Sequence, residues 1–140
     1  SANLVYLGHV LKALHKKSEF CFLTGPEEIT PHFVLMGGHG GVNGGANMFP
    51  KLYVDIYNAA AEKNIDKLMP LHKKVMQISE TIYRVGKYGS SIIKGIKCTL
   101  SIMGICDDYL AEPFHRFKTE ERKIIRDNLR KLNIEGYEIE

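Results

Sequence analysis

The chain has 140 residues and a mass of 15.8 kDa, about the size of one domain, and its 44% hydrophobic and 25% charged residues exclude intrinsic disorder and collagen-like structure. The net charge of +3 is too small to indicate a nucleic-acid partner. No apolar run approaches the ~18 residues of a membrane span, and the first residues lack a signal-peptide pattern. Three cysteines are too few for a secreted disulfide framework and indicate a cytoplasmic protein with reduced thiols. We expect Cys21, Cys98 and Cys106 to be small core residues.

The first quarter of the chain predicts a helix followed by a strand. Leucines recur at helical spacing from Leu4 to Leu14, which predicts an amphipathic helix that Ser1 or Asn3 caps. The short apolar run over residues 19–24 then ends at a Gly-Pro pair. That length and that ending favour a buried strand over a helix.

A second helix and a glycine-rich segment follow. Residues 26–36 return to a helical pattern, with two glutamates in the first turn, where the helix dipole favours negative charge. Six of the thirteen glycines lie in residues 37–47. We expect a second strand near residues 41–43, where the missing side chains let backbones approach closely.

The chain beyond Pro50 predicts only helices. Their apolar stripes run over residues 49–60, over 68–82 with Asp66 as N-cap, over 93–103, and from Thr119 to Leu132. The predicted order is therefore helix, strand, helix, strand and four helices. Strands joined by a crossover helix pair in parallel, and two such strands alone leave both edges of the sheet open. We therefore expect the chain to pair with other strands or to belong to something larger.

The two predicted strand ends carry the strongest functional signal. Thr24-Gly-Pro-Glu-Glu28 ends the first strand, and the glycine-rich segment 37–47 surrounds the second. In parallel α/β proteins the carboxyl ends of the strands build the active site, and glycines there leave room for a ligand.

These two motifs, together with Phe-Pro-Lys-Leu at residues 49–52, resemble strands seven and eight of the dihydrodipicolinate synthase / N-acetylneuraminate lyase family. Ile96-Lys97 and residues 100–105 resemble the helical tail of the same family. Its members are (β/α)8 barrels in which a strand-six lysine forms a Schiff base with pyruvate. The resemblance implies an α/β fold, with a partial barrel at residues 1–64 (strands seven and eight with their flanking helices) and a carboxyl-terminal helical extension at 65–140.

The resemblance also implies that the Schiff-base lysine lies just upstream of Ser1. The chain would then be the carboxyl-terminal portion of a longer enzyme, would contain no catalytic residue of its own, and would be inactive alone. The strand-four tyrosine and the strand-two carboxylate-binding motif of the family are also missing from these 140 residues.

The first motif carries three predicted substrate-binding residues. Gly25 matches the strand-seven glycine that leaves space beside the bound keto acid. Glu27 and Glu28 match acidic positions that hydrogen-bond substrate hydroxyls in the sialic acid lyases. The alternative is that both glutamates are only favourable charges in a helix first turn, worth ~0.3–1 kcal/mol each.

The second motif carries three more. Val42 matches the strand-eight apolar residue whose backbone carbonyl faces the Schiff base. Asn43 and Gly44 occupy positions that in relatives are Ser-Val or Gly-Ser. The glycine run could instead be a flexible loop or a phosphate cradle, although it contains no Gly-x-Gly-x-x-Gly or Walker pattern. His39 is either a catalytic base or a turn residue that tolerates an unusual backbone angle.

The resemblance predicts a pyruvate-dependent class I aldolase or lyase that needs no cofactor. A lysine amine attacks the ketone, and the resulting iminium accepts electrons while a carbon–carbon bond forms or breaks. The paired glutamates favour a 2-keto-3-deoxy sugar acid as substrate. Alternatives are dihydrodipicolinate synthase itself, which joins pyruvate to aspartate semialdehyde, and a non-catalytic barrel fragment or assembly module.

The predicted partners are pyruvate and an aldehyde or sugar acid, and relatives of this kind are commonly homo-oligomers. We expect no nucleic-acid partner, no membrane contact and no metal site. The six histidines and three cysteines show no spacing of the HExxH or CxxC kind.

Overall fold

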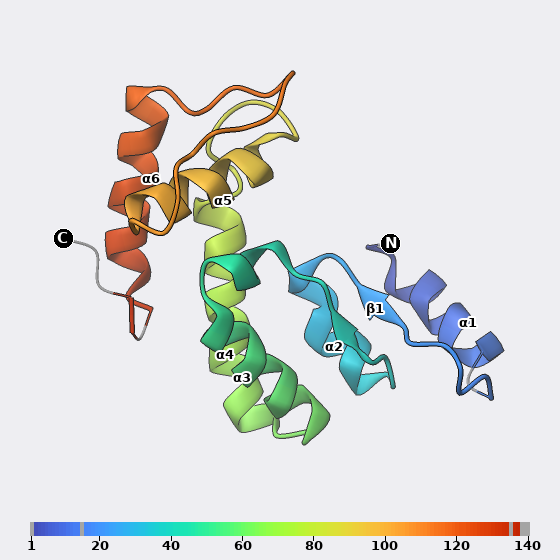
Figure 1. Cartoon of the computed structure of the whole chain (residues 1–140). Coiled ribbons are helices and arrows are strands. Elements are labelled where there is room, and N and C mark those ends of the chain that lie inside the picture. The colour runs from blue at the N-terminus through green and yellow to red at the C-terminus, as the bar shows by residue number, and fades with distance from the viewer. Residues whose placement is uncertain (1, 15, 135, 138–140) are drawn as a thin grey trace. The chain divides into compact units, whose positions relative to one another are not determined.

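The computed structural model describes residues 2–14, 16–134 and 136–137 (Figure 1). The chain is mostly helical, with one parallel two-stranded sheet. Its elements are α1 (Leu4–Leu14), β1 (Leu23–Thr24), α2 (Thr30–Leu35), β2 (Gly40–Gly41), α3 (Pro50–Ala61), α4 (Ile65–Thr81), α5 (Ser91–Ile102) and α6 (Thr119–Leu132). Two short 3-10 helices, Glu27–Ile29 and Gly44–Asn47, follow the two strands. The predicted order of helices and strands is confirmed.

The chain forms two compact units. The first comprises Ser1–Ala46 and Pro50–Val75, and the second comprises Asn47–Phe49 and Met76–Glu140. The predicted division between residues 64 and 65 refers to membership of a barrel and stays a prediction.

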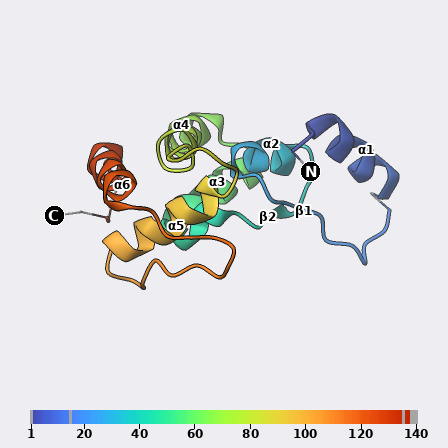
Figure 2. The same ribbon diagram turned by 90° about the horizontal axis from the view of Figure 1, so that it is seen from above.

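In the first unit, β1 and β2 pair in parallel, as predicted, with Leu23 opposite Gly40 and Thr24 opposite Gly41. Figure 2 shows the two strands side by side, and α2 packs against both β2 and α3. The first strand is shorter than the predicted 19–24. The backbone N–H of Phe22 donates to the His39 Nδ1 atom (3.0 Å) instead of to a strand carbonyl, so a side chain replaces one step of the ladder.

Side-chain caps and glycines determine where several helices and strands begin or end. The Asn3 side chain accepts from the Tyr6 N–H (3.0 Å), which confirms Asn3 as a cap of α1, whereas Ser1 lies outside the described residues. Asn64 caps α4 by accepting from the Lys67 N–H (3.1 Å), so the predicted cap at Asp66 is wrong. The positive φ angles of the glycine-rich segment fall on Gly37 and Gly40 rather than on His39, so His39 is not a turn residue with an unusual backbone angle.

In the second unit, α5 packs against α6 around a core that includes the buried side chains of Ile78, Ile82 and Ile125. Gly95 lets α5 approach the backbone just after α4 closely, because a Cβ atom there would lie 2.7 Å from the Ile82 carbonyl oxygen. No described helix has the length and apolar character needed to cross a membrane.

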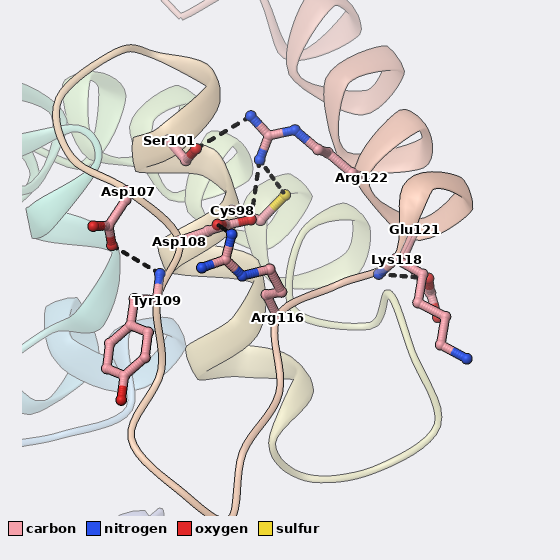
Figure 3. Close-up of polar contacts among 9 residues, drawn as sticks. All are labelled: Cys98, Ser101, Asp107, Asp108, Tyr109, Arg116, Lys118, Glu121 and Arg122. Carbon is pink, nitrogen blue, oxygen red and sulfur yellow. Dashed lines mark hydrogen bonds and ion pairs between the residues drawn. The ribbon is translucent and has the colours of Figure 1, made fainter.

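A polar cluster ties the segment after α5 to both helices (Figure 3). This Asp108 cluster consists of Cys98, Ser101, Asp108, Arg116 and Arg122. Arg122 donates to Asp108 (3.2 Å) and to the Ser101 hydroxyl (3.1 Å), and Arg116 lies 3.3 Å from the other Asp108 oxygen. The cluster holds residues 103–118, which form no helix or strand, against the α5–α6 pair.

The cysteine prediction is correct at one position of three. Cys98 is buried, whereas Cys21 and Cys106 are exposed thiols. Burial raises the pKa of the Cys98 thiol, and the nearby Arg122 only partly opposes that shift.

We therefore expect the three thiols to react at different rates. With iodoacetamide at neutral pH, Cys21 and Cys106 should be alkylated first, because only the accessible thiolate is nucleophilic. Cys98 should react only when the chain is unfolded in urea. Peptide mass mapping over time measures the order, and Cys98 labelling as fast as the other two would contradict it.

Candidate functional site

The site is set by the register of the two strands. Because Thr24 pairs with Gly41 in a parallel ladder, the segments that follow leave the sheet at the same edge, the one formed by the carboxyl ends of the strands. The Val42 N–H donates to the Thr24 carbonyl (2.8 Å) and continues the pairing by one step. The buried Thr24 hydroxyl has no hydrogen-bond partner among the described residues, which adds an unsatisfied polar group beside this edge.

Asn43 fastens the loop after β2 to the loop after β1. Its Nδ2 atom donates to the Gly25 carbonyl (3.0 Å) and to the Thr30 hydroxyl (2.9 Å), and that hydroxyl donates to the Pro26 carbonyl (3.1 Å). Gly41 is needed for this approach, because a Cβ atom there would lie 2.7 Å from both the Asn43 and Thr30 side chains. Asn43 therefore holds the two loops together in this structure.

Glu27 makes a second link between the same loops. The side chain is only 5% exposed, and its two carboxylate oxygens accept from different groups. The Gly45 N–H donates to one oxygen (2.8 Å), and the Tyr53 hydroxyl of α3 donates to the other. Hydrogen bonds to a buried carboxylate are stronger than neutral ones, so this link fixes the end of β1, the loop after β2 and the first turns of α3 together.

Glu28 has a different environment from its neighbour. It is partly exposed, and its backbone carbonyl lies 2.8 Å from the Nε2 atom of His72 on α4. The acidic pair thus separates into one buried carboxylate with a structural role and one carboxylate closer to solvent.

The remaining predicted residues lie at the same edge. Gly25 is exposed, and a Cβ atom built on it would meet nothing within 4 Å. The Val42 side chain is 71% exposed, and Gly44 begins the 3-10 helix after β2. The structure therefore brings all six predicted residues into one region, while their contacts with a substrate stay predictions.

The sequence analysis missed the residues that hold these six in place. The sequence pattern indicates only that Tyr53 lies on the apolar face of a helix. It does not distinguish Gly45 from the neighbouring glycines. Thr30 gives no signal in the sequence, because its role depends on a partner thirteen positions away. The three Gly-Gly pairs around Val42 and Asn43 were the nearest available hint of close backbone contact.

Two hollows accompany the sheet. One of about 350 Å³ lies along β2 and is lined by Thr30, Asn43, Tyr53 and Tyr57, among others. A larger one of about 580 Å³ is lined by α1 and by the segment before β1, away from Glu27 and Asn43. We place the candidate site by its polar groups rather than by volume, because the larger hollow contains none of the predicted substrate-binding residues.

Replacing Gly45 by alanine should strain this site. A Cβ atom would lie 2.0 Å from the Tyr53 hydroxyl oxygen and 2.7 Å from a Glu27 carboxylate oxygen, both of them buried. We expect a loss of about 2 kcal/mol in the free energy of unfolding, measured by urea denaturation. Gly25→Ala is the matched control, because the same added methyl group meets open space there. Equal losses in the two variants would contradict the assigned packing.

Two parallel strands joined by a helix, with the candidate site on the loops at their carboxyl ends, match the arrangement found at the active-site end of (β/α) barrels. Comparison with known proteins agrees with that class. The Dihydrodipicolinate synthetase family model matches residues 4–132, and the chain belongs to this family.

Two synthases are among the most similar proteins. The structure resembles that of dihydrodipicolinate synthase from Bacteroides thetaiotaomicron, with 54% identity, a TM-score of 0.91, and coverage of 94% of this chain and 44% of that one. The 4-hydroxy-tetrahydrodipicolinate synthase of Karelsulcia muelleri is 30% identical over 126 residues, which are 89% of this chain and 40% of the relative. The chain thus spans less than half the length of the proteins it matches.

A more distant structure shows the same fold. It is YagE, a prophage protein of the dihydrodipicolinic acid synthase family from E. coli K12, solved in complex with pyruvate. The identity is 17% and the TM-score 0.81, with coverage of 94% of this chain and 44% of that one.

Proposed function

We propose that this chain supplies strands seven and eight and the helical tail of a (β/α)8-barrel dihydrodipicolinate synthase, which condenses pyruvate with aspartate semialdehyde. The observation that carries the proposal is the 54% identity to the Bacteroides thetaiotaomicron synthase over nearly the whole chain. It favours the synthase, which was the alternative in the sequence analysis, over cleavage of a sugar acid.

The environment of Glu27 supports the same choice. The sugar-acid prediction depends on two carboxylates being available to substrate hydroxyls. Both oxygens of Glu27 are already hydrogen-bonded, to Gly45 and Tyr53, and the side chain is buried. Recruiting that carboxylate for a sugar hydroxyl would leave the Gly45 N–H and the Tyr53 hydroxyl without a partner, which is costly in a buried site.

The proposed chemistry assigns this chain a positioning role. The amine of a lysine preceding Ser1 adds to the pyruvate ketone, and loss of water gives an iminium. Loss of a proton from the pyruvate methyl group then gives the enamine, whose carbon adds to the aldehyde. The open space at Gly25 accommodates the keto acid, and the Val42 carbonyl orients the iminium. Asn43 and Glu27 hold these two backbone segments at a fixed separation.

Trapping with borohydride tests the proposal. The longer protein that carries this chain is incubated with pyruvate and sodium borohydride and then weighed by mass spectrometry. We expect one reduced pyruvate adduct on a lysine preceding Ser1 and none on the isolated 140 residues. Absence of any adduct on the longer protein would favour the non-catalytic alternative, and an adduct on the isolated chain would refute the predicted inactivity.

The acceptor is tested separately. Pyruvate consumption should depend on aspartate semialdehyde, and the enzyme should release no pyruvate from 2-keto-3-deoxy sugar acids. The opposite selectivity would support the hypothesis that the substrate is a 2-keto-3-deoxy sugar acid. The homo-oligomer that the family resemblance implies and the cytoplasmic location that the cysteine content indicates remain predictions.

A further inference from the structure

We propose that His32 of α2 and His72 of α4 form a binding site for one divalent transition-metal ion of the Zn²⁺ type. Both residues belong to the first unit, and neither is among the predicted substrate-binding residues. The sequence analysis expected no metal site, because the two histidines lie far apart in the chain and match no metal motif. Folding brings their rings together.

The separation of the two rings suits a shared metal ion. Their centroids lie 5.2 Å apart, and their planes are inclined by 76°. A Zn–N bond of about 2.0–2.1 Å places the metal about 3.2 Å from each imidazole centroid, and a tetrahedral angle then separates two centroids by about 5.2 Å. The rings meet edge to face in the structure, so the exposed His32 side chain has to rotate before one nitrogen of each ring faces a single ion.

Glu28 sets the tautomer of one ligand. The His72 Nε2 atom lies 2.8 Å from the Glu28 backbone carbonyl, which can only accept a hydrogen bond. Nε2 must therefore carry the proton, and in the neutral ring the lone pair is on Nδ1. A metal-binding histidine commonly donates its second ring N–H to a carbonyl in this way, which holds the ring in place and increases its basicity.

The surroundings admit an ion from solvent. A hollow of about 80 Å³ is lined by both histidines and by Pro31, Leu35 and Met69, among others. His32 is exposed, and Met69 is 59% exposed, so the site is open on one side. The described residues contain no group of three or more His, Cys, Asp or Glu side chains arranged for a metal, so water completes the coordination. Imidazole favours Zn²⁺, Cu²⁺ and Ni²⁺ over Mg²⁺ and Ca²⁺.

Calorimetric titration with ZnCl₂ tests the proposal. Because exposed thiols also bind zinc, the chelator-treated chain carries Cys21→Ser and Cys106→Ser in every sample. We expect one Zn²⁺ per chain, and a loss of affinity of more than about tenfold in both His32→Ala and His72→Gln. His72→Gln keeps an amide donor for the Glu28 carbonyl, and circular dichroism checks that the fold is retained. MgCl₂ should give no heat.

His9→Ala is the matched control, because His9 is an exposed histidine on α1. It should bind Zn²⁺ as the parent chain does. Imidazole resonances in a ¹H–¹⁵N spectrum provide a direct readout, and those of His32 and His72 should shift on addition of Zn²⁺. Absence of heat, unchanged affinity in both test variants, or an equal loss in His9→Ala would overturn the proposal. None of these outcomes bears on the proposed reaction.

Discussion

Replacing Glu27 by alanine should lower the free energy of unfolding by about 3 kcal/mol. The substitution removes the acceptor of two buried donors, the Gly45 N–H and the Tyr53 hydroxyl. Hydrogen bonds to charged groups contribute about 1.5–3 kcal/mol each, and donors left unsatisfied in a buried site lose their solvation as well. Urea denaturation followed by circular dichroism measures the change.

Two further variants separate the roles of this side chain. Glu28→Ala removes the neighbouring, partly exposed carboxylate and should cost less than about 1 kcal/mol. Glu27→Gln keeps one acceptor oxygen, so its loss in the free energy of unfolding should lie between those of Glu27→Ala and Glu28→Ala. Amide hydrogen exchange gives a local readout, because the Gly45 amide should lose its protection in Glu27→Ala. A Glu27→Ala protein as stable as Glu28→Ala would contradict the assigned link.

Helices could be predicted well because their signals are local. The start of α6 at Thr119 and the cap of α1 at Asn3 were both predicted, and each depends on residues within one turn. The first strand was predicted too long, because its length depends on a partner. That ladder is interrupted where the His39 side chain takes the place of a backbone group.

The candidate site was predictable as a region but not in its contacts. Glycine-rich and acidic motifs at two strand ends identified the region, since parallel pairing brings such ends together. The hydrogen bond between Glu27 and Tyr53 spans 26 positions, and nothing in the local pattern of either residue indicates it. Residue type alone therefore could not separate the structural carboxylate from the one nearer solvent.

The contacts of the Asp108 cluster in the second unit could not be predicted from the local sequence either. The charged run after residue 118 reads as a solvated helix face, and much of α6 is so. Arg122 is the exception, because its guanidinium turns toward α5 and the segment 103–118 (Figure 3). Its partner Asp108 is only 7% exposed and forms an ion pair with Arg116 as well.

Replacing Asp108 by alanine should therefore cost about 3 kcal/mol in the free energy of unfolding. Removing one partner of a buried ion pair typically costs 3–5 kcal/mol, and the lower end applies because both arginines reach solvent. Asp107→Ala is the matched control: Asp107 is exposed and accepts a hydrogen bond from the Tyr109 N–H, and its loss should cost less than about 1 kcal/mol.

Charge and shape contributions can be separated at the same position. Asp108→Asn keeps an acceptor oxygen and nearly the same volume. The decrease in its free energy of unfolding relative to the parent chain therefore reports mainly the contribution of the charge. Raising the salt concentration should reduce the difference in the free energy of unfolding between Asp108→Asn and the parent chain, because salt screens the ion pair with the exposed Arg116. If Asp108→Ala and Asp107→Ala unfold at the same urea concentration, the segment 103–118 is held by apolar contacts such as the buried Phe117 rather than by the ion pairs.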